Sequence, residues 1–190
     1  MQAISYKLIL ASQSPRRQQL MKDAGYTFEI RVKDTAENYP EALQGGDIAL
    51  YIANAKAAAF KGELAPNELL ITADTIVWLD GQALGKPIDR NDALSMLERL
   101  SGKMHRVFTG VCLSNCDRSQ SFVSMTEVYF KKLTRQEIDY YIDTYKPYDK
   151  AGSYGAQDWL GLVGIEKIHG SYFNVMGLPV KEVYEALLQF

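Results

Sequence analysis

Residues 69–79 (LLITADTIVWL) form a run of apolar and β-branched residues that a single carboxylate, Asp74, interrupts. This composition is typical of a buried β-strand, and the Asp80-Gly81 pair that follows predicts a tight hairpin. A carboxylate inside such a strand costs free energy unless it faces a metal ion, a cationic partner or a cleft. The run therefore predicts a central strand and favours a functional role for Asp74.

Length and composition are typical of one globular domain. The chain has 190 residues, of which 47% are hydrophobic and 23% are charged. A chain of this size can bury a sizeable core without disulfides or a structural metal ion. We therefore expect a single domain over residues 1–190.

The charge balance and the cysteines exclude several functional classes. The 21 Lys and Arg against 23 Asp and Glu give a net charge of −2, so we expect no binding to nucleic acid. The opening segment is too interrupted for a signal peptide, and no stretch approaches about twenty apolar residues. We expect no membrane association and a cytoplasmic location. Cys112 and Cys116 form a lone C-x3-C pair, which favours free thiols over a zinc site.

Hydrophobic periodicity and capping residues predict strands interleaved with helices, which indicates an α/β fold. Ser14 with Pro15 suits a helix start, either Asp89 or Asn91 can cap another helix, and Thr134 opens a capping box. The expected strands are 7–11, 26–32, 69–79, 82–84, 105–113, 121–130 and a strand near 162–168. The expected helices run from 15 to a stop at 25, over 47–61, from 89 or 91 to 100, over 135–144, and onward from 179.

The helix start at residues 12–17 (SQSPRR) has the composition of an anion site. Ser12 and Ser14 supply small hydroxyls, and Arg16 and Arg17 supply guanidinium groups beside a helix N-terminus. Helix N-termini carry unsatisfied N–H groups, and arginine matches phosphate oxygens with two parallel donors. A second interpretation stays open at this point, in which the serine and proline cap the helix and both arginines are solvated.

Taken one by one, three further charged residues are unremarkable. Glu37 lies in a polar loop, Lys56 on the flank of a helix and Lys86 in a loop before Pro87, and each of these positions is typical of a solvated surface residue. Only their combination with the other segments singles them out.

That combination consists of SQSPRR at 12–17, ANAKA around Lys56, ADT at 73–75, GKP at 85–87, AGSYGAQ at 151–157 and GSYFNVMGLP at 170–179. With these ordered motifs the chain resembles the Maf family of nucleoside triphosphate pyrophosphatases over nearly its whole length. The resemblance implies an elongated α/β fold similar to that of inosine triphosphate pyrophosphatases, with a mixed sheet, flanking helices and two lobes around a cleft. It also implies hydrolysis of a nucleoside triphosphate to the monophosphate and pyrophosphate with a divalent cation, Mg²⁺ or Mn²⁺, and it admits a homodimer.

The same resemblance implies roles for individual residues. Asp74 corresponds to the family's proposed proton acceptor, and Arg16, Thr75 and Gln157 to its specificity positions. Metal-assisted phosphoryl chemistry needs carboxylates around a cation, for which we expect Glu37 and Asp74. It also needs groups that bind phosphate oxygens, for which we expect Ser12, Ser14, Arg17, Lys56 and Lys86, and Arg16 would add its positive charge to theirs. Because an aspartate with an ordinary pKa of about 3.9 is a weak base, metal ligation is at least as plausible for Asp74 as proton abstraction.

The AGSYGAQ segment is similar to the branch of the family that acts on dTTP and UTP. A glutamine amide offers the donor and the acceptor that a uracil or thymine edge requires. The chain differs from the family pattern after Gln157, because Asp158 and Trp159 stand where a glycine often occurs, so the loop beside the base is expected to differ. We expect a pyrophosphatase for dTTP, UTP and modified pyrimidine triphosphates that cleans the nucleotide pool. The alternatives are the branch acting on 7-methyl-GTP and a non-catalytic nucleotide sensor that arrests division.

Overall fold

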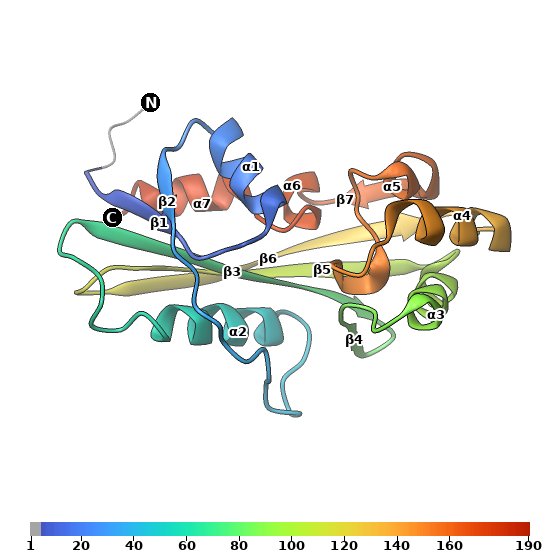
Figure 1. Cartoon of the computed structure of the whole chain (residues 1–190), viewed down its shortest axis with the longest axis horizontal. Helices are drawn as coiled ribbons and strands as arrows, with labels where there is room; N and C mark the ends of the chain where they lie inside the picture. The colour runs from blue at the N-terminus through green and yellow to red at the C-terminus, as the bar shows by residue number, and fades with distance from the viewer. Residues whose placement is uncertain (1–4) are drawn as a thin grey trace.

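A seven-stranded mixed sheet forms the centre of the molecule in the computed structural model, which describes residues 5–190 (Figure 1). The strand order is β2-β1-β3-β5-β6-β7, and β4 pairs with β3 beside this path. Strands β1, β2 and β3 are parallel, and the other neighbours are antiparallel. The strands are β1 Lys7–Leu10, β2 Phe28–Ile30, β3 Glu68–Leu79, β4 Gln82–Leu84, β5 Met104–Ser114, β6 Ser119–Phe130 and β7 Ile165–His169.

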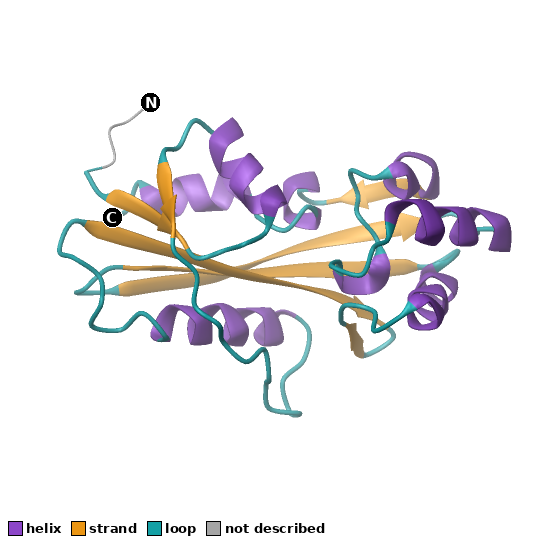
Figure 2. Cartoon of the chain, in the orientation of Figure 1, coloured by secondary structure: helices purple, strands orange, loops and turns teal. Residues whose placement is uncertain are grey.

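Helices cover both faces of the sheet. Figure 2 shows one long helix, α2, on one face and a group containing α1, α6 and α7 on the other. The helices are α1 Pro15–Asp23, α2 Gly46–Ala58, α3 Arg90–Leu100, α4 Arg135–Tyr145, α5 Trp159–Gly164, α6 Tyr172–Val175 and α7 Val180–Leu187, with a 3-10 turn at Ala151–Ser153.

Two hydrophobic clusters give the molecule two lobes along its long axis. One cluster joins β1, α1 and α7 around Leu10, Met21 and Val183. The other joins α3 and α4 to the opposite ends of the long strands around Leu97, Val107 and Ile142. Strands β3 and β5 contribute side chains to both clusters, so the lobes share one continuous sheet, and the molecule is elongated (Figure 1).

The alternation of side chains along β3 separates two environments. Thr72 donates to the carbonyl of Ala53 in α2, and Ile76 packs with the buried residues of that helix. Ala73, by contrast, packs with the cluster that contains α1 and α7. Since successive residues of a strand point to opposite faces, Asp74 faces α2 and Thr75 faces the side of α1.

Helix α2 contacts the sheet through its backbone because a glycine stands where the helix crosses β5. Gly110 is paired in register with Asp74 of β3. A Cβ atom at Gly110 would lie 2.4 Å from the backbone carbon and oxygen of Ala49. The missing side chain therefore allows the backbone of α2 to pack directly against the sheet, beside the position of Asp74.

Most elements predicted from the sequence are confirmed. The central strand and its hairpin occur as β3 and β4, residues 105–113 and 121–130 pair as β5 and β6, and the two cysteines are free. The side chains of Ser14, Asp89 and Thr134 cap α1, α3 and α4, the last with a complete capping box.

The prediction of a strand near 162–168 is wrong in its first half. Residues up to Gly164 belong to α5, and β7 begins only at Ile165. A Cβ atom at Gly161 would lie 1.9 Å from the carbonyl oxygen of Ala156, so this glycine allows a turn tight enough to start a short helix. Helix α6 was not predicted either.

Two sequence-based expectations, the domain over residues 1–190 and the absence of a signal peptide, involve residues that the structure does not describe. Residues 1–4, where the segment judged too interrupted for a signal peptide and the expected domain both begin, lie outside the described residues. From residue 5 onward, no helix has both the length and the apolar character needed to cross a bilayer.

We predict that Gly110→Ala destabilises the fold by about 1–3 kcal/mol, the usual cost of overpacking, because the new methyl group meets the backbone of Ala49. Urea unfolding measures this change. Gly85→Ala is the control, since a Cβ atom there has no neighbour within 4 Å. Equal midpoints for the two variants would contradict the close packing of α2.

Candidate active site

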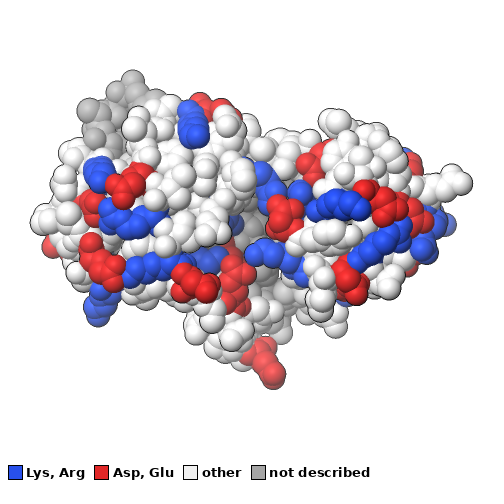
Figure 3. All heavy atoms as spheres, viewed as in Figure 1, with Lys and Arg blue, Asp and Glu red and all other residues white. Residues whose placement is uncertain are grey.

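A cleft of about 1180 Å³ opens between the lobes, where Figure 3 shows the molecule hollowed and charged side chains gathered around the hollow. Its position follows from the pairing of β3. Strand β1 covers residues 68–71 of β3 and β4 covers residues 77–79, both opposite the edge that pairs with β5. The cleft lies beside the intervening stretch, which contains Asp74 and Thr75.

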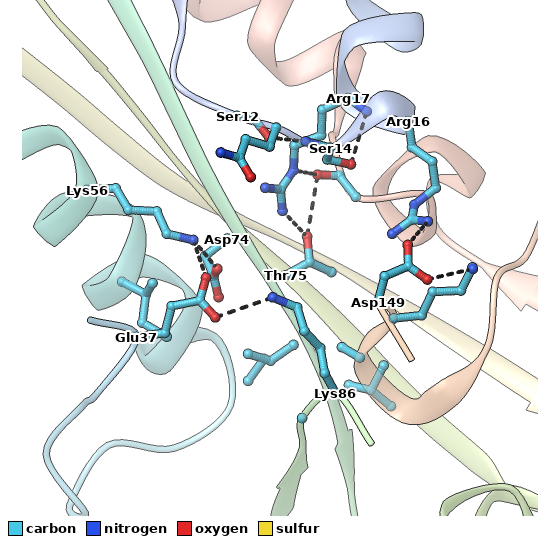
Figure 4. Close-up of a pocket in the computed structure, with 18 of the residues that line it drawn as sticks. Ser12, Ser14, Arg16, Arg17, Glu37, Lys56, Asp74, Thr75, Lys86 and Asp149 are labelled. Atoms are coloured by element: carbon cyan, nitrogen blue, oxygen red, sulfur yellow. Dashed lines mark hydrogen bonds and ion pairs between the residues drawn. The ribbon is translucent and has the colours of Figure 1, made fainter. Parts of the chain in front are cut away.

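The ammonium group of Lys56 joins two carboxylates at the floor of the cleft (Figure 4). Its Nζ atom lies 2.7 Å from Asp74 Oδ1 and 2.8 Å from Glu37 Oε1. Lys56 comes from α2, Asp74 from β3 and Glu37 from the loop after β2. Three segments distant in sequence therefore place two acids and one cation within hydrogen-bonding distance.

The two carboxylates differ in their environment. Burial raises the pKa of Asp74, which is only 8% exposed, although Lys56 and Arg17 oppose this shift. Burial also acts to raise the pKa of Glu37, but Lys56 and Lys86 outweigh it and hold that pKa below its ordinary value. Asp74 is accordingly the stronger base of the pair, and Glu37 is the more firmly ionised.

The guanidinium group of Arg17 donates hydrogen bonds to three other residues of the protein. Its Nε donates to the carbonyl of Gly177 at 2.7 Å, Nη1 to the carbonyl of Ala73 at 2.9 Å, and Nη2 to the hydroxyl of Thr75 at 2.9 Å. These bonds join α1 to β3 and to the segment after α6. The guanidinium therefore stands at the cleft wall with acceptors of the protein on all three nitrogens.

Both serines expected to bind phosphate act in the turn before α1. Ser12 Oγ accepts from the N–H of Ser14 at 3.2 Å, and Ser14 Oγ accepts from the N–H of Arg17 at 3.5 Å. Ser14 is thus the helix cap that one interpretation of the sequence predicted. Both residues also line the cleft, so capping and contact with an anion are compatible here.

Two ion pairs cross the cleft from one lobe to the other (Figure 4). Arg16 Nη1 lies 3.1 Å from Asp149 Oδ2, and Lys86 Nζ lies 3.6 Å from Glu37 Oε2. The Asp149 and Lys86 side chains are more than half exposed, and exposed pairs of this kind contribute about 0–1 kcal/mol. Arg16 and Lys86 can therefore exchange these partners for a ligand at little cost.

Sequence reasoning missed Asp149 and Lys150, which also line the cleft. The Lys150 ammonium lies 2.9 Å from Asp149 Oδ1, and burial acts against the Asp149 carboxylate while Lys150 and Arg16 together hold its pKa below the ordinary value. The available signal was the acid-base pair that immediately precedes the AGSYGAQ segment.

The two remaining specificity candidates differ in what they can offer a ligand. The Thr75 hydroxyl accepts from Arg17 and lies 2.9 Å from the Thr109 hydroxyl, so the protein already engages it. Gln157 lines the cleft, and its buried Oε1 has no hydrogen-bond partner among the described residues. A buried acceptor without a donor costs free energy, which a ligand N–H would recover.

The acidic groups fit a cation that is shared with a phosphate ligand. Within the described residues, no group of three or more His, Cys, Asp or Glu is arranged to hold a metal ion. Asp74 Oδ1 and Glu37 Oε1 both contact the Lys56 ammonium group, so the two carboxylates are neighbours, and each has a second oxygen. Mg²⁺ is commonly held by one or two carboxylates together with substrate phosphates and water, and this pair meets that requirement.

Comparison with known proteins identifies the family of this chain. A protein from Bacteroides fragilis named dTTP/UTP pyrophosphatase is 54% identical over 97% of this chain and 96% of its own length. One of the same name from Phocaeicola vulgatus is 54% identical over 96% and 95%. The structure of a HAM1 protein from Coxiella burnetii superposes with a TM-score of 0.50 at 13% identity, covering 97% of this chain and 100% of that one, which indicates a shared fold. Residues 7–190 match the family model of the Maf-like proteins, and the chain belongs to that family.

Proposed function

We propose that this chain hydrolyses dTTP and UTP to the nucleoside monophosphate and pyrophosphate. The observation that carries the proposal is the Asp74–Lys56–Glu37 cluster at the floor of a cleft with cationic side chains at its mouth. The relatives named dTTP/UTP pyrophosphatase, aligned over almost the whole chain, support the same reaction. Removal of unwanted or modified pyrimidine triphosphates is the cellular role that fits such an activity.

The phosphate end of the substrate would lie between Arg16, Lys56 and Lys86. Phosphoryl transfer is accelerated mainly by orienting the reactants and by neutralising charge on the phosphate oxygens. Arg16 and Lys86 would leave Asp149 and Glu37 to contact the triphosphate. Arg17, with all three nitrogens bonded within the protein, would orient the start of α1 and would add positive potential without releasing its own bonds.

Asp74 and Glu37 would hold the divalent cation, Mg²⁺ or Mn²⁺, jointly with phosphate oxygens. The bound cation would neutralise the triphosphate and lower the pKa of a coordinated water. Asp74 would orient the attacking water and accept its proton. Lys56 would keep both carboxylates in place and balance their charge.

The base end would lie against the segment that carries Gln157. The buried Oε1 of Gln157 lacks a donor among the described residues, and the N3–H of uracil or thymine can supply one. The amide Nε2 can donate at the same time to a base carbonyl. Cytosine has no proton on N3, so the same amide orientation would place two acceptors against each other.

The direct test is product analysis with purified protein, a panel of dTTP, UTP, CTP, ATP, GTP and 7-methyl-GTP, and Mg²⁺, Mn²⁺ or a chelator. We expect pyrophosphate and monophosphate from dTTP and UTP, lost on chelation. Turnover of 7-methyl-GTP alone would move the chain to the other branch of the family. Absence of any turnover would favour a nucleotide sensor.

We predict that Asp74→Asn lowers turnover of dTTP by at least a hundredfold, because the amide can neither accept the proton nor hold the cation comparably. The melting temperature should hold or rise, since the variant no longer buries a charge that burial disfavours. Asp143→Asn is the control, because its carboxylate pairs with Arg90 at the surface. Turnover near that of the control would refute the role of Asp74.

We predict that Gln157→Ala lowers the ratio of kcat/KM for dTTP to kcat/KM for dCTP about tenfold. This change corresponds to about 1.4 kcal/mol and lies in the range of one paired base contact. The ratio of kcat/KM for the two substrates measures it. Gln120→Ala serves as the control, since Gln120 lies on β6 and its side chain hydrogen-bonds to Gln189 near the C-terminus. An unchanged ratio would remove Gln157 from the base site.

A further inference from the structure

A glutamine amide cannot select uracil or thymine over cytosine by itself. Rotation of the amide by 180° exchanges its oxygen and nitrogen, and the two orientations are complementary to the two kinds of pyrimidine edge. Selection therefore requires surroundings that hold the amide in one orientation, and the backbone turn that carries Gln157 decides which surroundings its side chain meets in the cleft. An inference about what holds Gln157 in place rests on the proposed function. The residues concerned are ones to which the motif resemblance assigns no role.

Gln157 occupies the third position of a tight turn. The N–H of Asp158 donates to the carbonyl of Gly155 at 3.1 Å and closes the turn, with the buried Ala156 at its second position. The carboxylate of Asp158 folds back over the turn, because a Cβ atom at Gly155 would lie 2.5 Å from Asp158 Oδ2. Glycine at 155 is thus what allows Asp158 to occupy this place.

One tyrosine holds both ends of this turn. The Tyr141 hydroxyl donates to Asp158 Oδ2 at 2.8 Å and accepts from the N–H of Gly155 at 3.0 Å. Tyr141 lies in α4 and is fully buried, so the bonds start from a rigid position. Burial, reinforced by Asp158, raises the pKa of Tyr141, so the hydroxyl stays protonated and remains a donor.

Two further polar contacts lie next to the Gly155–Asp158 turn. The Lys150 ammonium, largely buried, lies 3.6 Å from Asp158 Oδ2. Before the turn, the Tyr154 hydroxyl lies 2.7 Å from Nε2 of the buried His105. The turn is therefore fixed on both sides by polar contacts to the lobe that contains α4, while Gln157 itself keeps an unpartnered oxygen within the described structure.

We propose that Asp158, acting with Tyr141, is a positioning residue that sets the pyrimidine selectivity of Gln157. Its carboxylate locks the Gly155–Asp158 turn so that the Gln157 oxygen meets the N3–H of uracil or thymine. Without this lock the turn can shift, the side chain of Gln157 is held less closely, and its amide can rotate to present its nitrogen to the N3 of cytosine. The chain thus uses its own Asp158, at a position where the family pattern often has glycine, as a determinant of substrate choice.

The test compares kcat/KM for dTTP and dCTP in Asp158→Ala, Asp158→Asn and Tyr141→Phe. We expect Asp158→Ala and Tyr141→Phe to lower the dTTP/dCTP ratio about tenfold, toward that of Gln157→Ala. Asp158→Asn should stay within about threefold of wild type, because its side-chain oxygen still accepts from Tyr141. An Asn variant as unselective as the Ala variant would overturn the role of this hydrogen bond. Tyr141→Phe keeps the test decisive if Asp158→Ala fails to fold.

The matched controls are Tyr140→Phe and Trp159→Phe, which alter the residues next to Tyr141 and Asp158 in the chain. Tyr140 and Trp159 pack against each other, with ring centroids 4.8 Å apart, and neither side chain is bonded to the turn in this structure. We expect both controls to keep the dTTP/dCTP ratio of the wild type. A tenfold loss of selectivity in the controls would show a general packing effect and overturn the proposal.

A double variant separates this proposal from the proposed function. In the Gln157→Ala background, Asp158→Ala should cause no further loss of the dTTP/dCTP ratio, because Asp158 acts through Gln157. A second tenfold loss would overturn the proposal and leave the proposed function intact. If the wild type lacks a preference for dTTP, the proposed function fails and the positioning role falls with it. If Gln157→Ala retains the preference, Gln157 leaves the base site and the positioning role fails, while the proposed hydrolysis stands.

Discussion

The packing of α2 against the sheet at Gly110 is the contact on which the site depends. Without a side chain at this position, the backbone of α2 meets β5 directly opposite Asp74 of β3. The helix is then close enough for Lys56 to reach the carboxylate at 2.7 Å. A charge in the middle of an apolar strand is costly unless it is paired, so the same packing that completes the core also makes Asp74 tolerable.

The second constraint is that β3 contributes side chains to the hydrophobic clusters of both lobes. Strands β1 and β4 cover its outer edge at the two ends and leave a gap between them. Side chains of both lobes meet over this gap, and the pairs Arg16–Asp149 and Lys86–Glu37 span it. Exposed pairs are weak, whereas Arg17 is half-buried and makes three hydrogen bonds within the protein. The wall of the cleft at Arg17 is therefore fixed, and the ion pairs at its rim can be exchanged for a ligand.

Local sequence patterns predicted most of the fold, and the family resemblance singled out residues that the structure places in one cleft, but neither predicted which of them the protein itself bonds. The run 69–79 and the caps at Ser14 and Thr134 act through neighbouring residues, and the structure confirms them. The start of α5 depends on the contact of Gly161 with the Ala156 carbonyl, which no periodicity encodes. Likewise, only the tertiary structure distinguishes Arg17, bonded within the protein, from Arg16, which faces Asp149.

The most direct test of this account is a crystal structure with Mg²⁺ and a dTTP analogue whose bond between the α and β phosphates cannot be hydrolysed. The account predicts the cation between the triphosphate and the carboxylates of Asp74 and Glu37, with Arg16 and Lys86 turned toward phosphate oxygens. It also predicts the N3–H of thymine on the Gln157 oxygen, with the Tyr141–Asp158 bond intact. An analogue bound with its base in solvent, or with its phosphates remote from Asp74, would contradict it.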